Sequence, residues 1–179
     1  MRNNLSQLIS LSKIEEKLYR PADAYELSRV TRMEHVKTTI VETPQEGIAA
    51  VAARIAQLIN RREANGQKTV LSLASGRSMR DLFVELVRLH KEEGLSFKNV
   101  VVFGSYEFYP LSDTTSGSMA QIQSQLLEHV DILPENVHTF PGDLPKEDVF
   151  AFCEEYEKAI VEAGGIDVQV LGIGQCGNI

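Results

Sequence analysis

A short segment rich in hydroxyl groups and glycine, Ser75-Gly76-Arg77-Ser78, stands between a predicted strand and a predicted helix. At such a junction, backbone N–H groups, side-chain hydroxyls and the positive end of the helix dipole face the same point. The segment therefore predicts an anion pocket, for phosphate in particular, built from Ser75, Gly76, Arg77 and Ser78. The alternative is a tight turn in which Ser78 only caps its helix. The segment is not a nucleoside-triphosphate loop, because no G-K-[ST] sequence follows it.

A carboxylate and three aromatic side chains follow the next predicted strand, in the sequence Tyr106-Glu107-Phe108-Tyr109. Glu107 is a candidate general base, and Tyr106 would form a polar wall of the same site. The spacing also allows a second interpretation, in which the glutamate is solvated and the aromatic rings belong to the core. The loop therefore supplies candidate catalytic residues without deciding between these roles.

Three glycines, Gly172, Gly174 and Gly177, follow the last predicted strand in a G-x-G-x-x-G pattern. A dinucleotide site would also need a following helix and an acidic residue about twenty positions later, so no dinucleotide cofactor is expected here. Cys176 could act as a nucleophile, but no histidine stands beside it, which favours a small buried side chain. The four histidines and two cysteines have no metal-ligand spacing, so no metal site is expected.

Strands and helices alternate along the chain in a pattern typical of repeated βαβ units. Thr43-Pro44-Gln45-Glu46 is a capping box with proline in the first helical position, and Ser78-Met79-Arg80-Asp81 predicts a second one. The alternation predicts an α/β fold, an open Rossmann-like parallel sheet with helices on both faces. Ligands of such sheets bind beyond the carboxyl ends of the strands, so the three loops should converge. The predicted strands are residues 69–74, 99–103, 136–140 and 167–172, and the predicted helices begin near residues 44, 78, 118 and 146.

Composition restricts the partners and the compartment. The 179 residues carry a net charge of −7 and are 43% hydrophobic, so a nucleic-acid partner is not expected. No apolar run reaches the roughly 18 residues of a membrane helix, and the first residues lack the apolar stretch of a signal peptide. These features predict a cytoplasmic protein without a membrane partner. Apolar residues at helical steps over residues 5–18 indicate a helical N-terminal arm, residues 1–36, before a partial α/β domain, residues 37–179.

Several long segments make the chain similar to a known family. They are Tyr19-Arg20-Pro21-Ala22-Asp23, Glu42-Thr43-Pro44-Gln45-Glu46-Gly47, His90-Lys91-Glu92-Glu93-Gly94-Leu95-Ser96-Phe97-Lys98-Asn99-Val100, His129-Val130-Asp131-Ile132 and Gly164-Gly165-Ile166-Asp167. On these segments the chain resembles the glucosamine-6-phosphate deaminases over almost its whole length, and their Bacteroidetes-type branch most closely. The resemblance implies a metal-free enzyme that converts glucosamine 6-phosphate into fructose 6-phosphate and ammonia, often as a hexamer. It also implies a relationship to the 6-phosphogluconolactonases.

The positions that carry the chemistry agree with this family less well than the scaffold does. Tyr106 stands where the family has the aspartate that acts as proton-transfer base, Cys176 replaces a polar or acidic residue, and Asn178 replaces the histidine involved in ring opening. Arg77 occupies a position that is usually small, while the hydroxyls and the glycine of the turn are retained. A tyrosine, with a reference pKa of about 10, is a poor base for the C2 proton. The resemblance therefore predicts a degenerate deaminase with weak or no activity.

Two further hypotheses agree with the same residues. The chain could be a non-catalytic sugar-phosphate binder or an assembly partner that has retained the turn from Ser75 to Ser78. It could also be a different isomerase or lactonase that uses Glu107, a hypothesis that depends on one residue. The strand over residues 167–172 has no predicted helix after it, and an uncovered apolar edge predicts self-association into a homo-oligomer.

Overall fold

The chain divides into two units, Met1–Ile40 and Val41–Ile179. A computed structural model describes residues 22–30, 32, 38–174, 176, 177 and 179. In the first unit it describes one helix, α1 (Ala24–Val30), which begins where the Asp23 carboxylate accepts a hydrogen bond from the Glu26 N–H at 2.8 Å. The helix predicted over residues 5–18 lies outside the described residues.

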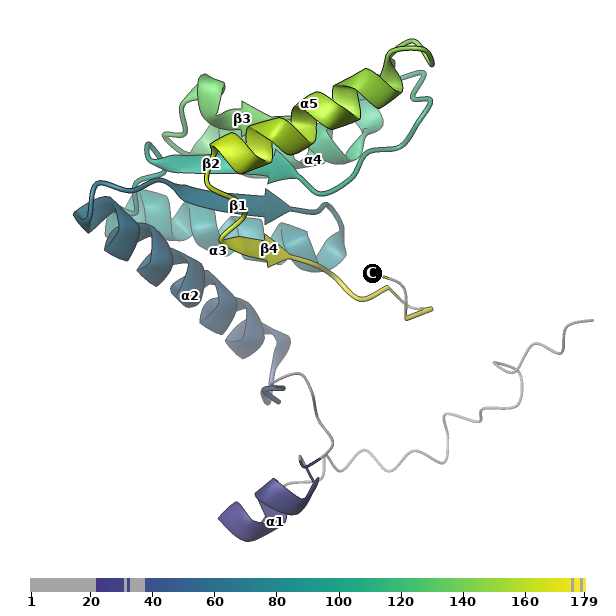
Figure 1. The fold of residues 1–179 in the computed structure, drawn as a ribbon. Helices are drawn as coiled ribbons and strands as arrows, with labels where there is room; N and C mark the ends of the chain where they lie inside the picture. Colours follow the sequence, from purple (N-terminus) through teal and green to yellow (C-terminus); the bar gives the residue numbers. More distant parts are fainter. Residues whose placement is uncertain (1–21, 31, 33–37, 175, 178) are drawn as a thin grey trace, which may run out of the picture. The chain divides into compact units, whose positions relative to one another are not determined.

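A parallel sheet forms the centre of the second unit. Its strands are β1 (Thr69–Leu73), β2 (Val100–Gly104), β3 (Val137–His138) and β4 (Val168–Val170). They lie in the order β3-β2-β1-β4, and every neighbouring pair is parallel, with Thr69 opposite Val100 and Leu71 opposite Val168 (Figure 1). All residues of β1 and β2 are buried, as is usual for central strands of a parallel sheet that is covered on both faces.

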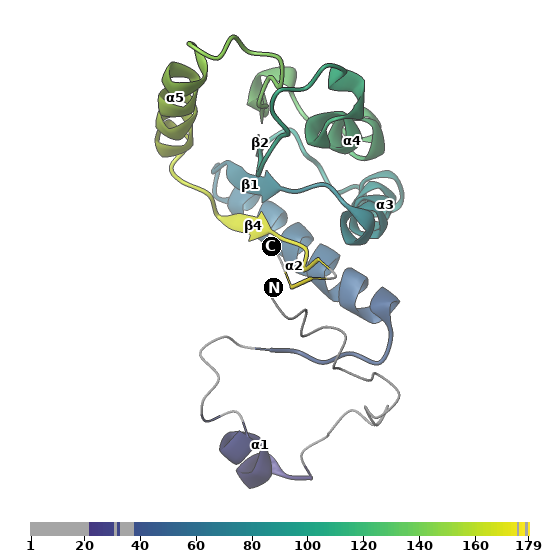
Figure 2. The ribbon, with the colours of Figure 1, turned by 90° about the vertical axis from the view of Figure 1, so that its right-hand side faces the viewer.

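Helices cover both faces of this sheet, which confirms the predicted α/β class (Figure 2). Helices α2 (Pro44–Ala64), α3 (Arg77–Glu93) and α4 (Ser118–Gln125) pack on one face, and α5 (Val149–Glu162) packs on the other. Short 3₁₀ helices connect them at Thr114–Ser116, Leu127–His129 and Pro134–Asn136. The first face buries Leu71 and Val102 against Ile55, Phe83 and Ile122, while the second buries Phe103 against Tyr156.

The two predicted capping boxes have different outcomes. Thr43 caps α2 as predicted, because its Oγ1 accepts a hydrogen bond from the Glu46 N–H at 3.2 Å. The second prediction is wrong. Helix α3 begins at Arg77, with Gly76 as its N-cap, and no side chain caps it. Gly76 has a φ of 134°, which L side chains rarely adopt, and this turn starts the helix before Ser78.

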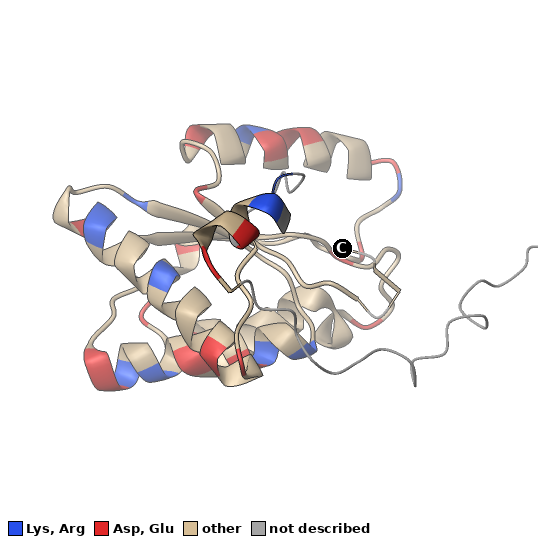
Figure 3. Ribbon diagram, turned by 90° about the horizontal axis from the view of Figure 1, so that it is seen from below, with Lys and Arg blue, Asp and Glu red and all other residues tan. Residues whose placement is uncertain are grey.

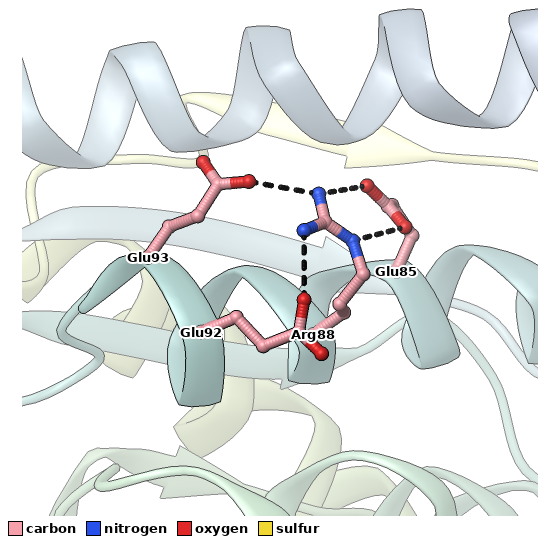
Figure 4. A network of polar contacts seen from close by, with 4 residues as sticks. All are labelled: Glu85, Arg88, Glu92 and Glu93. Atoms are coloured by element: carbon pink, nitrogen blue, oxygen red, sulfur yellow. Dashed lines mark hydrogen bonds and ion pairs between the residues drawn. The ribbon is translucent and has the colours of Figure 1, made fainter.

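A cluster of charges covers the solvent side of α3 near its C-terminal end. The Arg88 guanidinium contacts the carboxylates of Glu85, Glu92 and Glu93 at 2.7, 3.1 and 2.9 Å (Figure 4). These contacts raise the pKa of Arg88, and the hydrogen bond from Arg88 lowers the pKa of Glu85. Eleven residues of helix, about 16 Å, separate Arg88 from the start of α3, so its charge does not contribute to the turn there.

Asp167 attaches the edge strand β4 to the rest of the unit. Its carboxylate accepts a hydrogen bond from the Val70 N–H at 2.9 Å and forms an ion pair with Arg62. The Asp167 N–H in turn donates to the Val70 carbonyl at 2.9 Å. Beyond β4 the described residues include three exposed apolar side chains, Leu171, Ile173 and Ile179. Their exposure agrees with an uncovered apolar edge, and self-association through it stays a prediction.

Candidate functional site

The turn after β1 leaves the start of α3 open. Ser75 is half-buried, Gly76, Arg77 and Ser78 are exposed, and no side chain among the described residues accepts a hydrogen bond from the first turn of the helix. Met79 points into the core, with 5% of its surface exposed, and therefore does not cover the turn. Free N–H groups and the positive end of a 17-residue helix consequently face solvent beside two hydroxyls.

Two arginines in the first turn of α3 add positive charge near these N–H groups. Arg77 and Arg80 are exposed, and neither forms an ion pair with a carboxylate within the described part of the chain. The helix on the opposite face of the sheet differs in charge, because α5 carries Glu154, Glu155, Glu157 and Glu162 with a single lysine (Figure 3). The open start of α3 thus combines the features that attract an anion.

Tyr106 brings the second predicted loop to this turn. Its hydroxyl lies 2.9 Å from Ser75 Oγ and 3.5 Å from the Ser75 carbonyl oxygen. A second pair of hydroxyls, Ser72 and Ser105, lies 2.9 Å apart beneath them, and the Ser105 N–H donates to the Leu73 carbonyl. The carboxyl ends of β1 and β2 therefore form one site, as their parallel pairing predicts.

The aromatic rings of this loop are not core residues, so that alternative interpretation is wrong. Tyr106, Phe108 and Tyr109 are 40%, 58% and 47% exposed. They follow the last residue of β2, beyond the part of the sheet that the helices cover. The rings of Tyr106 and Phe108 meet edge to face, with centroids 5.8 Å apart.

Glu107 is half-buried and turned toward α4. Its Oε1 accepts hydrogen bonds from the N–H groups of Phe108 and Ser118 at 2.9 and 2.8 Å, and its Oε2 accepts one from Met119 at 3.0 Å. The carboxylate therefore binds the N-terminus of a helix and is not freely solvated. Its role as a general base stays a prediction.

A cavity of about 250 Å³ lies beside this carboxylate. Its lining combines the polar side chains of Glu107, Gln123 and Thr139 with the apolar side chains of Met119 and Phe140. None of the residues that line it is a lysine, an arginine or a histidine. The cavity is thus chemically different from the turn at the start of α3.

The third predicted loop follows β4, whose carboxyl end lies at the same edge of the sheet as that of β1, and no hydrogen bond joins its described residues to the other two loops. Cys176 is exposed, which contradicts its prediction as a small buried side chain. The physical reason is that this loop follows β4, an edge strand beyond which no further strand pairs among the described residues. Asn178 lies outside the described residues. Within the described part of the loop, the Gly177 N–H donates a hydrogen bond to the Gly174 carbonyl.

Sequence reasoning missed two partners in this site. Ser72 is a buried hydroxyl between two leucines of β1, and this polar residue in a buried strand is a signal that the sequence contains. Gly117 precedes α4, and a Cβ atom there would lie 2.6 Å from Glu107 Oε2. A glycine before a helix carries no local sign of a carboxylate ten residues earlier.

Two searches of the described residues concern metals and membranes. No group of three or more His, Cys, Asp or Glu side chains there could hold a metal ion. None of the helices described is both long and apolar enough to cross a membrane.

The amino-acid sequence is similar to one protein family and to individual relatives. Residues 42–177 match the family model described as glucosamine-6-phosphate isomerases/6-phosphogluconolactonase. A glucosamine-6-phosphate deaminase-like protein of Bacteroides thetaiotaomicron is 43% identical over 180 residues, which cover 100% of this chain and 27% of the relative. A glucosamine-6-phosphate deaminase of Porphyromonas gingivalis is 40% identical over 111 residues, which cover 62% of this chain and 41% of the relative.

Solved structures have the same arrangement of strands and helices. A monomeric glucosamine-6-phosphate deaminase superposes with a TM-score of 0.69 and 30% identity, over 80% of this chain and 57% of that one. The 6-phosphogluconolactonase of Thermotoga maritima has the same fold, with a TM-score of 0.62 and 23% identity, over 76% of this chain and 59% of the other. This chain thus spans only 27% and 41% of the two curated relatives, yet the family model matches most of its residues. The chain belongs to the glucosamine-6-phosphate isomerase/6-phosphogluconolactonase family.

Proposed function

We propose that the open turn at the start of α3 binds the phosphate group of a sugar phosphate. Ser75 and Ser78 would supply hydroxyls, Gly76 the close backbone approach, and Arg77 a positive charge. The uncapped first turn of the helix and the exposure of Arg77 support this assignment. The family membership supports the substrate class, because relatives carry the name glucosamine-6-phosphate deaminase.

We further propose that this chain deaminates glucosamine 6-phosphate weakly or not at all. Tyr106 holds the position of the family's aspartate base, and its hydroxyl is engaged with Ser75 at 2.9 Å. A phenol keeps its proton at neutral pH in its ordinary state, and loss of a general base commonly slows a reaction by about 10²- to 10⁴-fold. Cys176 and Asn178, at the other substituted positions, point in the same direction.

Phosphate binding would not restore the reaction. It contributes affinity that the substrate and the transition state share, and shared affinity does not lower the barrier to proton transfer. The protein would then act as a non-catalytic sugar-phosphate binder. The contact between Tyr106 and Ser75 is the observation that carries this proposal, because it supports a phenol engaged beside the turn, at the position that the resemblance assigns to the family's base.

A coupled ammonia assay and a binding measurement on the purified chain test both parts. We expect glucosamine 6-phosphate to bind, seen by calorimetry, while turnover stays below about 1 s⁻¹, the low end for ordinary enzymes. Turnover above that value would overturn the proposal if it falls in a Glu107→Gln variant, because the activity then belongs to this chain. Turnover that is unchanged in the variant would point to a contaminating host deaminase. Absence of binding would overturn the phosphate assignment.

A cytoplasmic location and self-association belong to the same proposal. Cys153 and Cys176 are both free thiols, as is usual in a reducing compartment. Light scattering after size-exclusion chromatography would measure the mass of the particle, and a clean monomer would contradict the homo-oligomer.

A further inference from the structure

The Glu107 carboxylate joins the loop after β2 to the start of α4, eleven and twelve residues further along the chain. It accepts hydrogen bonds from Ser118 and Met119 at the start of α4, at 2.8 and 3.0 Å, and from the neighbouring Phe108 N–H at 2.9 Å. Helix α4 has no cap from its own N-cap residue, Gly117. The distant glutamate therefore caps this helix.

Two residues at the start of α4 fit around that carboxylate. A Cβ atom on Gly117 would lie 2.6 Å from Glu107 Oε2 and 2.9 Å from Oε1, so only glycine leaves room for both oxygens. Ser118 is fully buried, and its hydroxyl has no hydrogen-bond partner among the described residues. The serine therefore does not cap the helix, although serine is a preferred capping residue, and this task falls to Glu107.

Tyr106 and Glu107 are neighbours in the loop after β2, yet their side chains contact different parts of the structure. Tyr106 precedes Glu107 in the chain, and the N–H of the next residue, Phe108, donates a hydrogen bond to the Glu107 carboxylate. The Glu107 side chain is held toward α4, whereas the side chain of the neighbouring Tyr106 reaches the turn after β1. There the Tyr106 hydroxyl lies 2.9 Å from Ser75 Oγ.

We propose that Glu107 is the positioning residue of the site at the turn: by capping α4 it holds the loop after β2 so that the Tyr106 hydroxyl meets Ser75. This role concerns the proposed sugar-phosphate site, and its functional importance rests on that proposed function. The contact itself is present without a ligand, so it can be tested whether or not phosphate binds.

Nuclear magnetic resonance on the chain with labelled tyrosine rings tests the proposal. The cross-peak between the Tyr106 ring and the Ser75 β-protons is the readout, and a Tyr106→Phe variant assigns the ring among the five tyrosines. Glu107→Gln removes one acceptor oxygen and turns an amide donor toward an N–H of α4. Gly117→Ala leaves the glutamate in place and pushes its carboxylate off the helix. Glu128→Gln, at an exposed glutamate of the 3₁₀ helix Leu127–His129, is the matched control.

We expect the cross-peak to be lost in both Glu107→Gln and Gly117→Ala, and retained in Glu128→Gln. We also expect the affinity for inorganic phosphate to fall at least threefold in the first two variants. A cross-peak that persists in both would overturn the proposal and reduce Glu107 to a helix cap. If Glu107→Gln does not fold, the cross-peak is measured in Glu107→Asp instead. The aspartate keeps the charge, but its shorter side chain does not reach the N–H groups of α4, so we expect the same loss. If the unaltered chain binds no phosphate, the proposed function fails, while the cross-peak still decides the role of Glu107.

Discussion

The Tyr106 hydroxyl lies 2.9 Å from Ser75 Oγ, across the gap between the loops that follow β2 and β1. Thirty-one residues separate the two side chains in sequence. Their contact joins the turn that we propose binds phosphate to the loop that carries Tyr106 and Glu107. The phenol can donate a hydrogen bond to a ligand, but it supplies no carboxylate to remove a proton.

Replacing Tyr106 with phenylalanine should weaken the binding of glucosamine 6-phosphate about two- to tenfold. The variant loses one hydroxyl beside Ser75, and a single neutral hydrogen bond contributes about 0.5–1.5 kcal/mol. Isothermal titration calorimetry measures the change. Tyr109→Phe is the control, because its hydroxyl bonds to the Leu144 carbonyl and not to the turn, and its affinity should be unchanged. Equal affinities in all three proteins would contradict a role of Tyr106 in ligand binding.

Arg77→Gln should weaken the same binding by about tenfold or more, since hydrogen bonds to charged groups contribute about 1.5–3 kcal/mol. The affinity of the variant should also depend less on salt concentration, because the variant lacks one electrostatic attraction that salt screens. Arg54→Gln, at an exposed position of α2, is the control for the change in net charge. The assignment of Arg77 fails if both variants lose the same affinity.

Asp167→Ala should lower the free energy of unfolding by about 1–3 kcal/mol. The substitution leaves the Val70 N–H without its acceptor and removes the partner of Arg62. Urea unfolding followed by circular dichroism gives the difference. Asp148→Ala is the comparison, because Asp148 is exposed and its side chain makes no capping hydrogen bond to α5. A loss as small as that of Asp148→Ala would contradict the role of Asp167 as the attachment of β4.

His138 should make the protein less stable in mild acid. Its partial burial, with a smaller effect of Lys68, lowers its pKa below 6.5, and its ring stacks on Phe103 at 4.3 Å. The unfolded chain therefore takes up a proton on this residue at a higher pH than the folded chain does. The stability that the neutral ring contributes is complete above about pH 6.5 and decreases as the pH falls through the lowered pKa.

Unfolding measured between about pH 7 and pH 5 checks this sign. The decrease in the free energy of unfolding on acidification should be smaller in His138→Gln than in the unaltered chain, because glutamine does not titrate. His129→Gln, at an exposed histidine, should leave the decrease as it is. A stability that rises on acidification would show that the charged form of His138 is favoured in the folded protein.

Local sequence patterns predicted most of the scaffold. The apolar runs at β1 and β2 and the capping box at Thr43 depend on residues close together in the chain, so their outcome could be foreseen. The start of α3 was predicted at the wrong residue for a related reason. Ser78 has the composition of a cap, but the φ of 134° at Gly76 starts the helix earlier, and a glycine does not reveal its φ in a sequence.

The amino-acid sequence by itself determined the α/β class, the family and the types of residue available at the ends of the strands. Only the tertiary structure decided which of them meet. Tyr106 reaches Ser75 because β1 and β2 pair in parallel register, and Glu107 turns to α4 because Gly117 leaves it room. Contacts of this kind join residues that are distant in the chain, and they follow from packing and backbone hydrogen bonding that no local pattern records.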